Sequence, residues 1–302
     1  MLLQQELTWL ERQTEIEADL ARLEERGTDF FHPDIVLNPY QTAPLTAMVL
    51  FQTEVPTTVQ VVILAPDGTA DLQYQSAETT MHRVAIYGLY ADCTTRVQLT
   101  LATGEQQEIQ IATGALPVEV AQGTAEGTLS LEDWIFTVPL TDTALPAAYD
   151  KDGICRWYTT QSLAYQLVQL ANGHLLTCGP KLLSPPYSAT AIWEMDILGK
   201  IYKEYRVPGG FCNGFFVMEN GNILTLHQFF NRATAADLCV EIDAQTGKII
   251  KEWDIRALLP MSKGGSTSQN GSDWFHANGI SYQAEDDAVI ISGKHQDCII
   301  ST

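Results

Sequence analysis

The stretch NGHLLT at residues 172–177 returns 48 residues later as NGNILT at residues 220–225. A second pair has nearly the same displacement, because EMDILGKIYKEY at 194–205 is matched by EIDAQTGKIIKEW at 241–253. Each copy combines a turn, an apolar strand, a D-x-x-G-K hairpin and a further strand. A third, degenerate copy is DDAVII at 286–291, which is displaced further by a Gly/Ser-rich insertion at 258–273.

A repeat of about 40–50 residues with four strands has the size of a propeller blade. One such sheet cannot bury both of its faces alone, so neighbouring units stack around an axis. We therefore predict a mainly β chain in which residues 116–302 form an incomplete β-propeller of three to four blades. The final CIIST at 298–302 continues a strand pattern. We expect a chain that is truncated relative to a closed propeller, or one completed by a second chain.

Upstream of the repeats, between residues 28 and 115, the hydrophobic period is two. Strand-like runs lie at 46–51, 58–64, 84–87 and 97–101, and turn residues lie between them at 66–68 and 103–104. Short strands at this spacing predict a small antiparallel β-sandwich domain over 28–115. No catalytic set of residues occurs in it, so we expect a scaffold or an interface.

The first 27 residues carry a helical pattern. Apolar residues recur at intervals of three and four, and Gly27 is a suitable C-terminal stop; the apolar positions are Leu3, Leu7, Leu10, Ile16, Leu20 and Leu23. This predicts an amphipathic N-terminal helix over 1–27 that docks on its own chain. The alternative is a helix that joins two chains in a homodimer.

Composition excludes several classes of partner. Lys and Arg number 17 against 37 Asp and Glu, so the formal net charge is −20. A surface this acidic repels phosphate backbones and anionic lipid, so we expect no nucleic acid and no membrane partner. The N-terminal MLLQQELTWL has neither a basic nor a long apolar region, which predicts a cytoplasmic chain without a signal peptide. Six dispersed cysteines without C-x-x-C predict free thiols and no metal site, and no cofactor is indicated.

The densest polar cluster is DWFHANG at 273–279, followed by SGKHQD at 292–297. On a strand, His276 and Asn278 would point to the same side, and Lys294 and His295 would lie on a neighbouring strand. An imidazole, a carboxamide and an ammonium group that converge can hold a cluster of anionic oxygens. From spacing alone, a purely structural role for these side chains is favoured.

Three stretches resemble the bacterial aryl-sulfate sulfotransferases, the PAPS-independent arylsulfotransferase family. HP…LNPYQTAPLTA at 32–47 resembles the signature of the family's N-terminal sandwich, and 196–224 resembles a blade next to the active site. DWFHAN at 273–278 with KHQD at 294–297 resembles the family's D-W-F-H-x-N … S-R-H-Q-D pair, which is the most specific of the three.

The resemblance implies a six-bladed propeller that carries a small β domain. It also implies ping-pong transfer of a sulfuryl group from a phenolic sulfate ester to a phenol, through a covalent sulfo-histidine. The small-molecule partners would be the aryl sulfate and the phenol. By resemblance, His276, Asn278 and Lys294 are the catalytic residues that hold the sulfuryl oxygens. The residues Asn213, Phe275 and His295 are predicted to bind substrate.

This sequence also departs from the family's pattern. Lys294 stands where the family usually has Arg, which keeps the charge but loses the planar bidentate fork. Residues 212–214 read CNG where the family usually shows His-His-Asp. The nucleophilic histidine belongs to a later blade and is expected beyond residue 302.

Two other interpretations stay open. A diverged, catalytically inactive propeller would bind an aromatic or anionic ligand without turnover. Alternatively, IDAQTGK at 242–248 followed by Trp253 resembles the docking segment of quinoprotein dehydrogenases. That motif is weak, because a D-x-x-T-G turn joins outer strands in many propellers.

Overall fold

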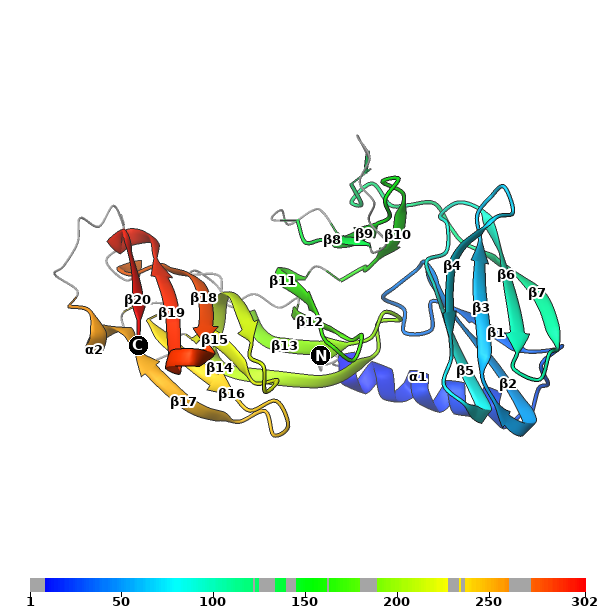
Figure 1. Ribbon diagram of the computed structural model, residues 1–302, viewed down its shortest axis with the longest axis horizontal. Helices are drawn as coiled ribbons and strands as arrows, with labels where there is room; N and C mark the ends of the chain where they lie inside the picture. The colour runs from blue at the N-terminus through cyan, green and yellow to red at the C-terminus, as the bar shows by residue number, and fades with distance from the viewer. Residues whose placement is uncertain are drawn as a thin grey trace, which may run out of the picture. The chain divides into compact units, whose positions relative to one another are not determined.

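The computed structural model (Figure 1) describes residues 9–121, 123–124, 134–139, 145–161, 163–179, 189–227, 234, 237–260 and 273–302. For residues 164, 165, 208, 212 and 213 it describes the backbone alone. The chain is mainly β and divides into two compact units. Unit 1 comprises Met1–Ser162 with Met195–Ile201, and unit 2 comprises Leu163–Glu194 with Tyr202–Thr302.

Unit 1 contains two antiparallel sheets whose strands alternate along the chain, because β3 and β4 of one sheet come between β2 and β5 of the other. The three-stranded sheet has the order β1 (Asp34–Leu37), β2 (Thr46–Thr57), β5 (Thr79–Tyr87). The four-stranded sheet has the order β4 (Ala70–Gln75), β3 (Val59–Leu64), β6 (Thr94–Leu101), β7 (Gln106–Ala112). All four strand-like runs predicted from the sequence are strands of these sheets.

Both sheets contribute their inward side chains to one hydrophobic core. On β3, Val59, Val61 and Ile63 are fully buried, while Gln60 between them is exposed. They pack with alternate residues of β2, β5, β6 and β7. Burial of one such side chain is worth about 1.5–3 kcal/mol. The period-two pattern therefore becomes the inner and outer faces of two packed sheets.

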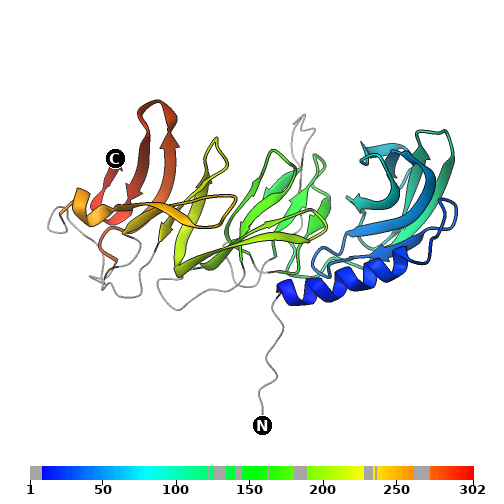
Figure 2. The ribbon, with the colours of Figure 1, turned by 90° about the horizontal axis from the view of Figure 1, so that it is seen from below.

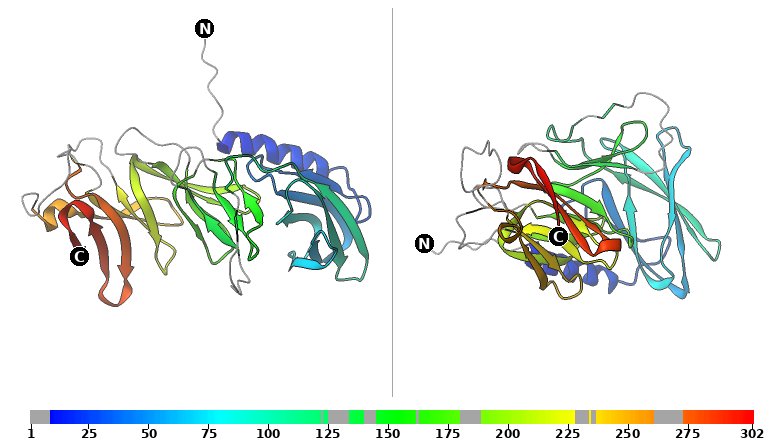
Figure 3. Two further views of the ribbon diagram at one scale, coloured as in Figure 1. Left: turned by 90° about the horizontal axis from the view of Figure 1, so that it is seen from above. Right: turned by 60° about the vertical axis from the view of Figure 1, so that its left-hand side comes forward.

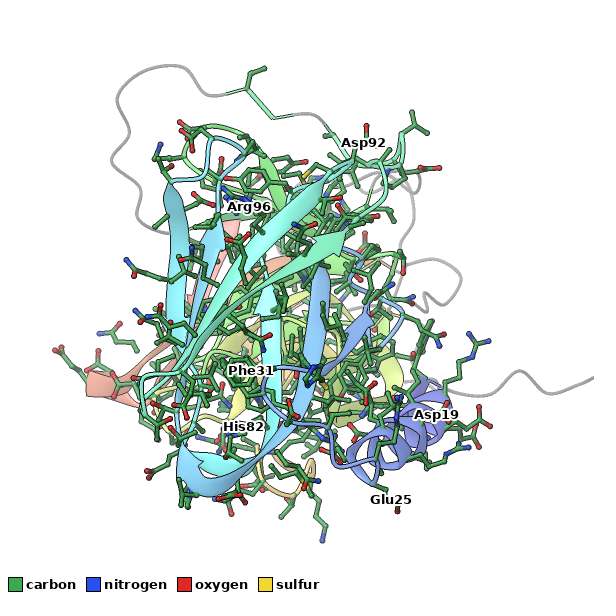
Figure 4. All side chains as sticks on the ribbon, turned by 90° about the vertical axis from the view of Figure 1, so that its right-hand side faces the viewer. Asp19, Glu25, Phe31, His82, Asp92 and Arg96 are labelled. Atoms are coloured by element: carbon green, nitrogen blue, oxygen red, sulfur yellow. The ribbon has the colours of Figure 1, made fainter. Side chains whose placement is uncertain are left out.

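Helix α1 (Trp9–Glu24) packs on the three-stranded sheet through its apolar face (Figure 2). Leu20 is buried against Tyr40, Met48 and Leu50, with Ile16 and Leu23 beside it. Asp19 and Glu25 are exposed (Figure 4). The predicted helix is confirmed over these residues and docks on its own chain. Its expected members Leu3 and Leu7 lie outside the described residues.

Gly27 follows the last turn of α1 in a left-handed conformation, with φ +64°. A residue with a β-carbon pays a steric cost there, which is why glycine is common just past helix ends. The predicted stop at Gly27 is confirmed.

A group of charges also fastens α1 within unit 1. Glu17 accepts hydrogen bonds from the Tyr40 hydroxyl and from the Arg83 guanidinium, both at 2.7 Å, and pairs with Lys200 at 2.5 Å. Burial alone would raise the pKa of Glu17. The hydrogen bonds from Lys200, Arg83 and Tyr40 outweigh burial and lower this pKa to about 2.

Unit 1 continues past the two sheets with a short three-stranded sheet, ordered β10 (Cys155–Tyr158), β9 (Ala147–Tyr149), β8 (Ile135–Thr137). Arg156 of β10 is buried and pairs with Asp71 at 2.6 Å and Asp150 at 3.1 Å, and it also donates to the Gly88 carbonyl. A buried cation needs such partners, and these tie the small sheet to the rest of the unit. The domain boundaries at 27 and 115 stay a prediction.

Unit 2 contains a seven-stranded antiparallel sheet whose strands are neighbours in chain order (Figure 1). Its strands are β11 (Ala164–Gln169), β12 (Leu175–Cys178), β13 (Ala189–Met195), β14 (Ile201–Val217), β15 (Ile223–His227), β16 (Leu238–Ile242) and β17 (Ile249–Asp254). The long strand β14 lies in the middle. Gly209 and Gly210 within it have φ near +88° and +84°, and beyond them residues Phe211–Val217 pair with β15.

The sequence repeat corresponds to equal contacts in this sheet. His174 and Asn222 occupy the same position in the two copies, each just before a buried strand. His174 Nδ1 lies 2.7 Å from Glu194 Oε1, and Asn222 Nδ2 donates to Glu241 Oε1 at 2.6 Å. The repeated Asn-Gly and Glu-x-Asp stretches therefore encode one contact between neighbouring strands, made twice.

Helix α2 (Ile255–Leu258) follows β17, and a three-stranded sheet ends unit 2 (Figure 3). Its order is β18 (Ala277–Gln283), β19 (Ala288–Gly293), β20 (Cys298–Ser301), with short 3-10 turns Ala284–Asp286 and Lys294–Gln296 between the strands. Most of the insertion at 258–273 lies outside the described residues.

The cysteines and the helices bear on two further expectations, namely free thiols and no membrane partner. Five described cysteines are free thiols, namely Cys93, Cys155, Cys178, Cys239 and Cys298. Burial raises the pKa of Cys155 to about 11 and that of Cys178 to about 12, so both thiols are held protonated. Among the described residues, no helix has the length and apolarity that crossing a membrane requires.

Candidate functional site

The polar cluster predicted at 273–297 lies at one end of the β18–β19–β20 sheet. Ala277, the first residue of β18, pairs with Gly293, the last residue of β19. The segment before β18 and the turn after β19 are therefore neighbours. Two main-chain hydrogen bonds join them, from Lys294 N to His276 O at 3.1 Å and from His295 N to Phe275 O at 3.2 Å.

Three side chains meet at this end of the sheet. His276 Nδ1 lies 2.6 Å from Asp273 Oδ2, and His295 Nδ1 lies 2.7 Å from the Asp273 carbonyl oxygen. The ring centroids of His276 and His295 are 4.6 Å apart, with the planes inclined by 45°. The side chains of Asp273, His276 and His295 are 22%, 29% and 14% exposed, so all three are partly open to solvent.

The backbone at His276 is unusual, because its φ is +50°. Residues other than glycine seldom adopt this left-handed region, and histidine is among the side chains found there more often. Such conformations cost of order 1–3 kcal/mol and are concentrated at functional sites. The surrounding packing holds His276 in place before the first residue of β18.

The segment that carries the cluster is anchored in the hydrophobic core by Trp274 and Phe275. Trp274 and Phe275 are buried in the core of this end of unit 2. Phe275 packs so closely on Gly293 that a β-carbon there would lie 2.5 Å from the ring. Gln296 donates from Nε2 to the Trp274 carbonyl at 2.6 Å, which fastens the turn to the same segment.

The expected placement of the polar residues on two regular strands is wrong. His276 precedes β18, and the pairing of β18 with β19 shifts between Ala277 and Gly279, so Asn278 is the extra residue of a bulge. His276 and Asn278 are therefore not successive positions on one face of a regular strand. Residues Lys294–Gln296 form a 3-10 turn rather than a strand. The four residues 294–297 between β19 and β20 make this change of direction.

The predicted site residues divide into three groups. His276 and His295 are brought together, while Lys294 is exposed in the turn after β19 and Asn278 is exposed at the second residue of β18. Phe275 is fully buried, and its packing is that of a core residue with no face open to a ligand. The side chain of Asn213 lies outside the described residues.

The sequence reasoning missed Asp273 as a member of the site. Its signal was the three-residue spacing from His276, which in a tight loop brings a carboxylate back to an imidazole. That the Asp273 carbonyl would also reach His295, 22 residues later, depends on the register of β18 and β19 and could not be read from spacing.

The same three residues offer one carboxylate oxygen and two imidazole nitrogens within 4.8 Å of one another. Zn²⁺ and related divalent ions bind such donors. In the observed arrangement, however, the 2.6 Å and 2.7 Å separations are hydrogen bonds, and they engage the Nδ1 atoms of both rings. The prediction that the site holds no metal stays a prediction.

Chemically, the cluster is suited to an anion with several oxygens. A protonated imidazole donates from both ring nitrogens, a neutral one donates from one nitrogen and accepts at the other, and an ammonium group donates only. The two imidazoles and the Lys294 ammonium group lie on a chain whose formal charge is −20. An anionic ligand would need such a local concentration of donors to overcome the net repulsion.

Two family models match the chain, and together they cover most of it. One is described as the arylsulfotransferase Ig-like domain and matches residues 34–114. The other is described as arylsulfotransferase (ASST) and matches residues 95–302, which include the whole cluster at 273–297. This chain belongs to the arylsulfotransferase family. The resemblance seen in the three sequence stretches is thereby confirmed.

Two curated relatives share this family and are named arylsulfate sulfotransferase AssT. The one from Escherichia coli O6:H1 (strain CFT073) is 23% identical over 241 residues, which are 62% of this chain and 36% of the relative. The one from Lelliottia amnigena is 22% identical over 203 residues, 50% of this chain and 33% of the relative. The chain spans about a third of the length of the relatives it matches.

The family also decides between the interpretations left open. The D-x-x-T-G stretch that resembled a quinoprotein segment is the turn between β16 and β17, where Asp243 Oδ1 accepts a hydrogen bond from the Thr246 amide at 2.7 Å. It closes a hairpin, as such turns do in many β proteins. An inactive, ligand-binding relative is not favoured by the match to relatives named as sulfotransferases.

Proposed function

We propose that the protein to which this chain belongs transfers a sulfuryl group from a phenolic sulfate ester to a phenol, without PAPS. The observation that carries the proposal is the family match over residues 95–302, together with the meeting of the His276 and His295 rings at one sheet end, where the main chain of Lys294 bonds to that of His276. Sulfuryl transfer, like phosphoryl transfer, needs an in-line nucleophile and donors on the equatorial oxygens.

The proposed chemistry has two balanced steps. In the first, a nucleophilic imidazole forms an S–N bond while the bond from sulfur to the phenolic oxygen breaks, and the phenolate leaves and takes up a proton. In the second, an acceptor phenol loses its proton, its oxygen bonds to sulfur, and the S–N bond breaks. His276, Asn278 and Lys294 would hold the sulfuryl oxygens through both steps, and His295 would assist substrate binding.

We also propose that the strands of unit 2 belong to a β-propeller. Strands β11, β12, β13 and the first half of β14 make one four-stranded run, and the second half of β14 with β15, β16 and β17 makes another. Strands β18, β19 and β20 supply three strands of a further unit. The equal contacts of His174 and Asn222 in the two runs support the assignment to successive blades.

Turnover of p-nitrophenyl sulfate by the protein to which this chain belongs tests the proposed function, because the nucleophilic histidine is expected beyond residue 302. We expect p-nitrophenol release that depends on added phenol, with phenyl sulfate formed in equal amount, and a large loss of release in His276→Gln. His174→Gln is the matched control, because that histidine pairs with Glu194 in the sheet. Continuous release without an acceptor, beyond the one equivalent that the first step frees, or release unaffected by His276→Gln, would show a different reaction or a different site.

A further inference from the structure

Asp273 forms hydrogen bonds with two histidines, one through its carboxylate and one through its main-chain carbonyl. Its carboxylate oxygen Oδ2 lies 2.6 Å from His276 Nδ1, and its main-chain carbonyl oxygen lies 2.7 Å from His295 Nδ1. The carboxylate is also 3.8 Å from His295 Nδ1. Asp273 therefore contacts the Nδ1 atom of each of the two imidazole rings.

These contacts determine which nitrogen of each ring carries a proton. A carbonyl oxygen and an ionised carboxylate can only accept hydrogen bonds. Both Nδ1 atoms must therefore be donors, and Nε2 is the nitrogen of each ring that remains for a ligand. The hydrogen bond made by one ring nitrogen sets the role of the other.

The position of Asp273 is itself held by the fold. The next two residues, Trp274 and Phe275, are buried, and Trp274 Nε1 donates to Asp237 Oδ2 at 3.4 Å. The main-chain bonds from Lys294 to His276 and from His295 to Phe275 join the loop to the turn. Main-chain hydrogen bonds thus hold Asp273 and the two rings together, although His276 comes from the segment before β18 and His295 from the turn after β19.

We propose that Asp273 is a positioning residue that fixes His276 and His295 as Nδ1–H tautomers, so that both rings meet the sulfate ester through Nε2. The inference rests on the proposed function for the identity of the ligand, whereas the tautomers themselves do not depend on it. A protonated ring then donates from Nε2 to a sulfuryl oxygen. A neutral ring accepts the hydroxyl proton of a phenol at the same atom.

Nitrogen NMR on the chain labelled with ¹⁵N-histidine tests this directly, at about pH 8, where an ordinary imidazole is neutral. The signals of the two rings are assigned with His276→Gln and His295→Gln. We expect both rings of the unaltered chain to carry their proton on Nδ1. In Asp273→Asn, whose amide can donate to Nδ1, the His276 population should move toward Nε2–H. His295 should not change, because the carbonyl that holds it is still present.

A second readout is the affinity for p-nitrophenyl sulfate. Loss of the partner that orients a metal-bound histidine typically costs about 10–100-fold, and we expect Asp273→Asn to weaken binding by a factor of the same order. Asp297→Asn is the matched control. Asp297 is an exposed carboxylate in the turn between β19 and β20, and asparagine tolerates its left-handed backbone conformation. We expect the control to bind as the unaltered chain does.

Several outcomes would overturn the inference. Nε2–H tautomers in the unaltered chain would do so even if Asp273→Asn failed to fold. An unchanged His276 tautomer in folded Asp273→Asn would also overturn it, as would stoichiometric Zn²⁺ held by the two rings. Correct tautomers without any binding of the sulfate ester would uphold the role of Asp273 and count against the proposed function instead.

Discussion

At the scale of single residues, the candidate site combines an unusual backbone with an ordinary turn. His276 lies in the left-handed region, whereas Asp297 closes the β19–β20 turn in the same way as Asp287 closes the β18–β19 turn, each after a three-residue 3-10 segment. The turn that carries His295 is therefore a repeated hairpin geometry. The left-handed backbone of His276, by contrast, is not part of a repeated turn and is specific to the candidate site.

Lys294 offers the sharpest test of charge at this site. Its ammonium group is exposed in the turn beside His276, and charge-assisted hydrogen bonds are worth about 1.5–3 kcal/mol. We expect Lys294→Ala to raise the KM for the sulfate ester by roughly ten-fold or more, measured by p-nitrophenol release. Lys248→Ala, in the β16–β17 turn, removes the same charge elsewhere in unit 2 and should leave KM unchanged. An unaffected KM in Lys294→Ala would remove Lys294 from the site.

Gly293 tests the placement of Phe275 in the core. An added β-carbon would meet the Phe275 ring at 2.5–2.9 Å, so Gly293→Ala should destabilise the chain by about 1–3 kcal/mol. Urea unfolding measures the change in the free energy of unfolding. In the double variant Gly293→Ala/Phe275→Leu, the smaller leucine side chain should restore part of the lost stability. Gly279→Ala, whose β-carbon meets only Ser292 Oγ at 3.1 Å, is the control. Equal stabilities of Gly293→Ala and the unaltered chain would contradict this packing.

At the scale of elements, the clearest predictions came from long periodic segments. The apolar stripe of α1 and the alternating runs of β3, β5 and β6 were readable because each buries one face, whereas the apolar run of β2 is buried on both faces, against the sheet core and against α1. Strands β1, β4 and β7 were not predicted. At the edge of its sheet, β4 packs Leu72 and Tyr74 only partly against the core and leaves Gln73 between them exposed. An edge strand is defined by its neighbour's hydrogen bonds, which a local pattern does not carry.

The candidate site shows the same limit. The residues of the cluster could be predicted as a group from the motif at 273–278 and 294–297. Their placement could not, because regular alternation was assumed where the chain has a bulge at Asn278 and a turn at Lys294–Gln296. The role of Asp273 depends on the register between β18 and β19, which is a tertiary property.

The anchoring of α1 makes a pH prediction at this scale. The pKa of Glu17 is about 2 in the folded chain against an ordinary value of 4.5, because Lys200, Arg83 and Tyr40 hold its ionised form. The folded state thus binds fewer protons than the unfolded state between these values. The stability from Glu17 is fully present above pH 4.5 and is lost as pH falls toward about 2.

Glu17→Gln should therefore be less stable than the unaltered chain at neutral pH, by a few degrees in Tm, and the difference should shrink as pH falls through that window. Thermal unfolding followed by circular dichroism at a series of pH values measures it. Glu15→Gln, an exposed position in the same helix, should show no such convergence. A constant difference at all pH values would contradict the proposed ion pairs.

At the scale of the whole molecule, the chain combines the family's Ig-like domain with a region that matches the arylsulfotransferase model. The family models match residues 34–114 and 95–302, while the relatives are about three times as long as the matched part. The repeat that first indicated a propeller runs through unit 2 as two equal strand sets, and the polar cluster follows them in the third. The polar cluster that we propose as the substrate site therefore comes after the two repeated strand sets in the chain.

The binding of p-nitrophenyl sulfate to this chain tests the central claim, that residues 273–297 form the sulfate-ester site. Isothermal titration calorimetry on the unaltered chain and on His276→Gln measures it without any need for turnover. We predict one site per chain, competition by inorganic sulfate, and an affinity at least about ten-fold weaker in His276→Gln. Equal affinity of the two chains, or no binding to the unaltered chain, would contradict the account.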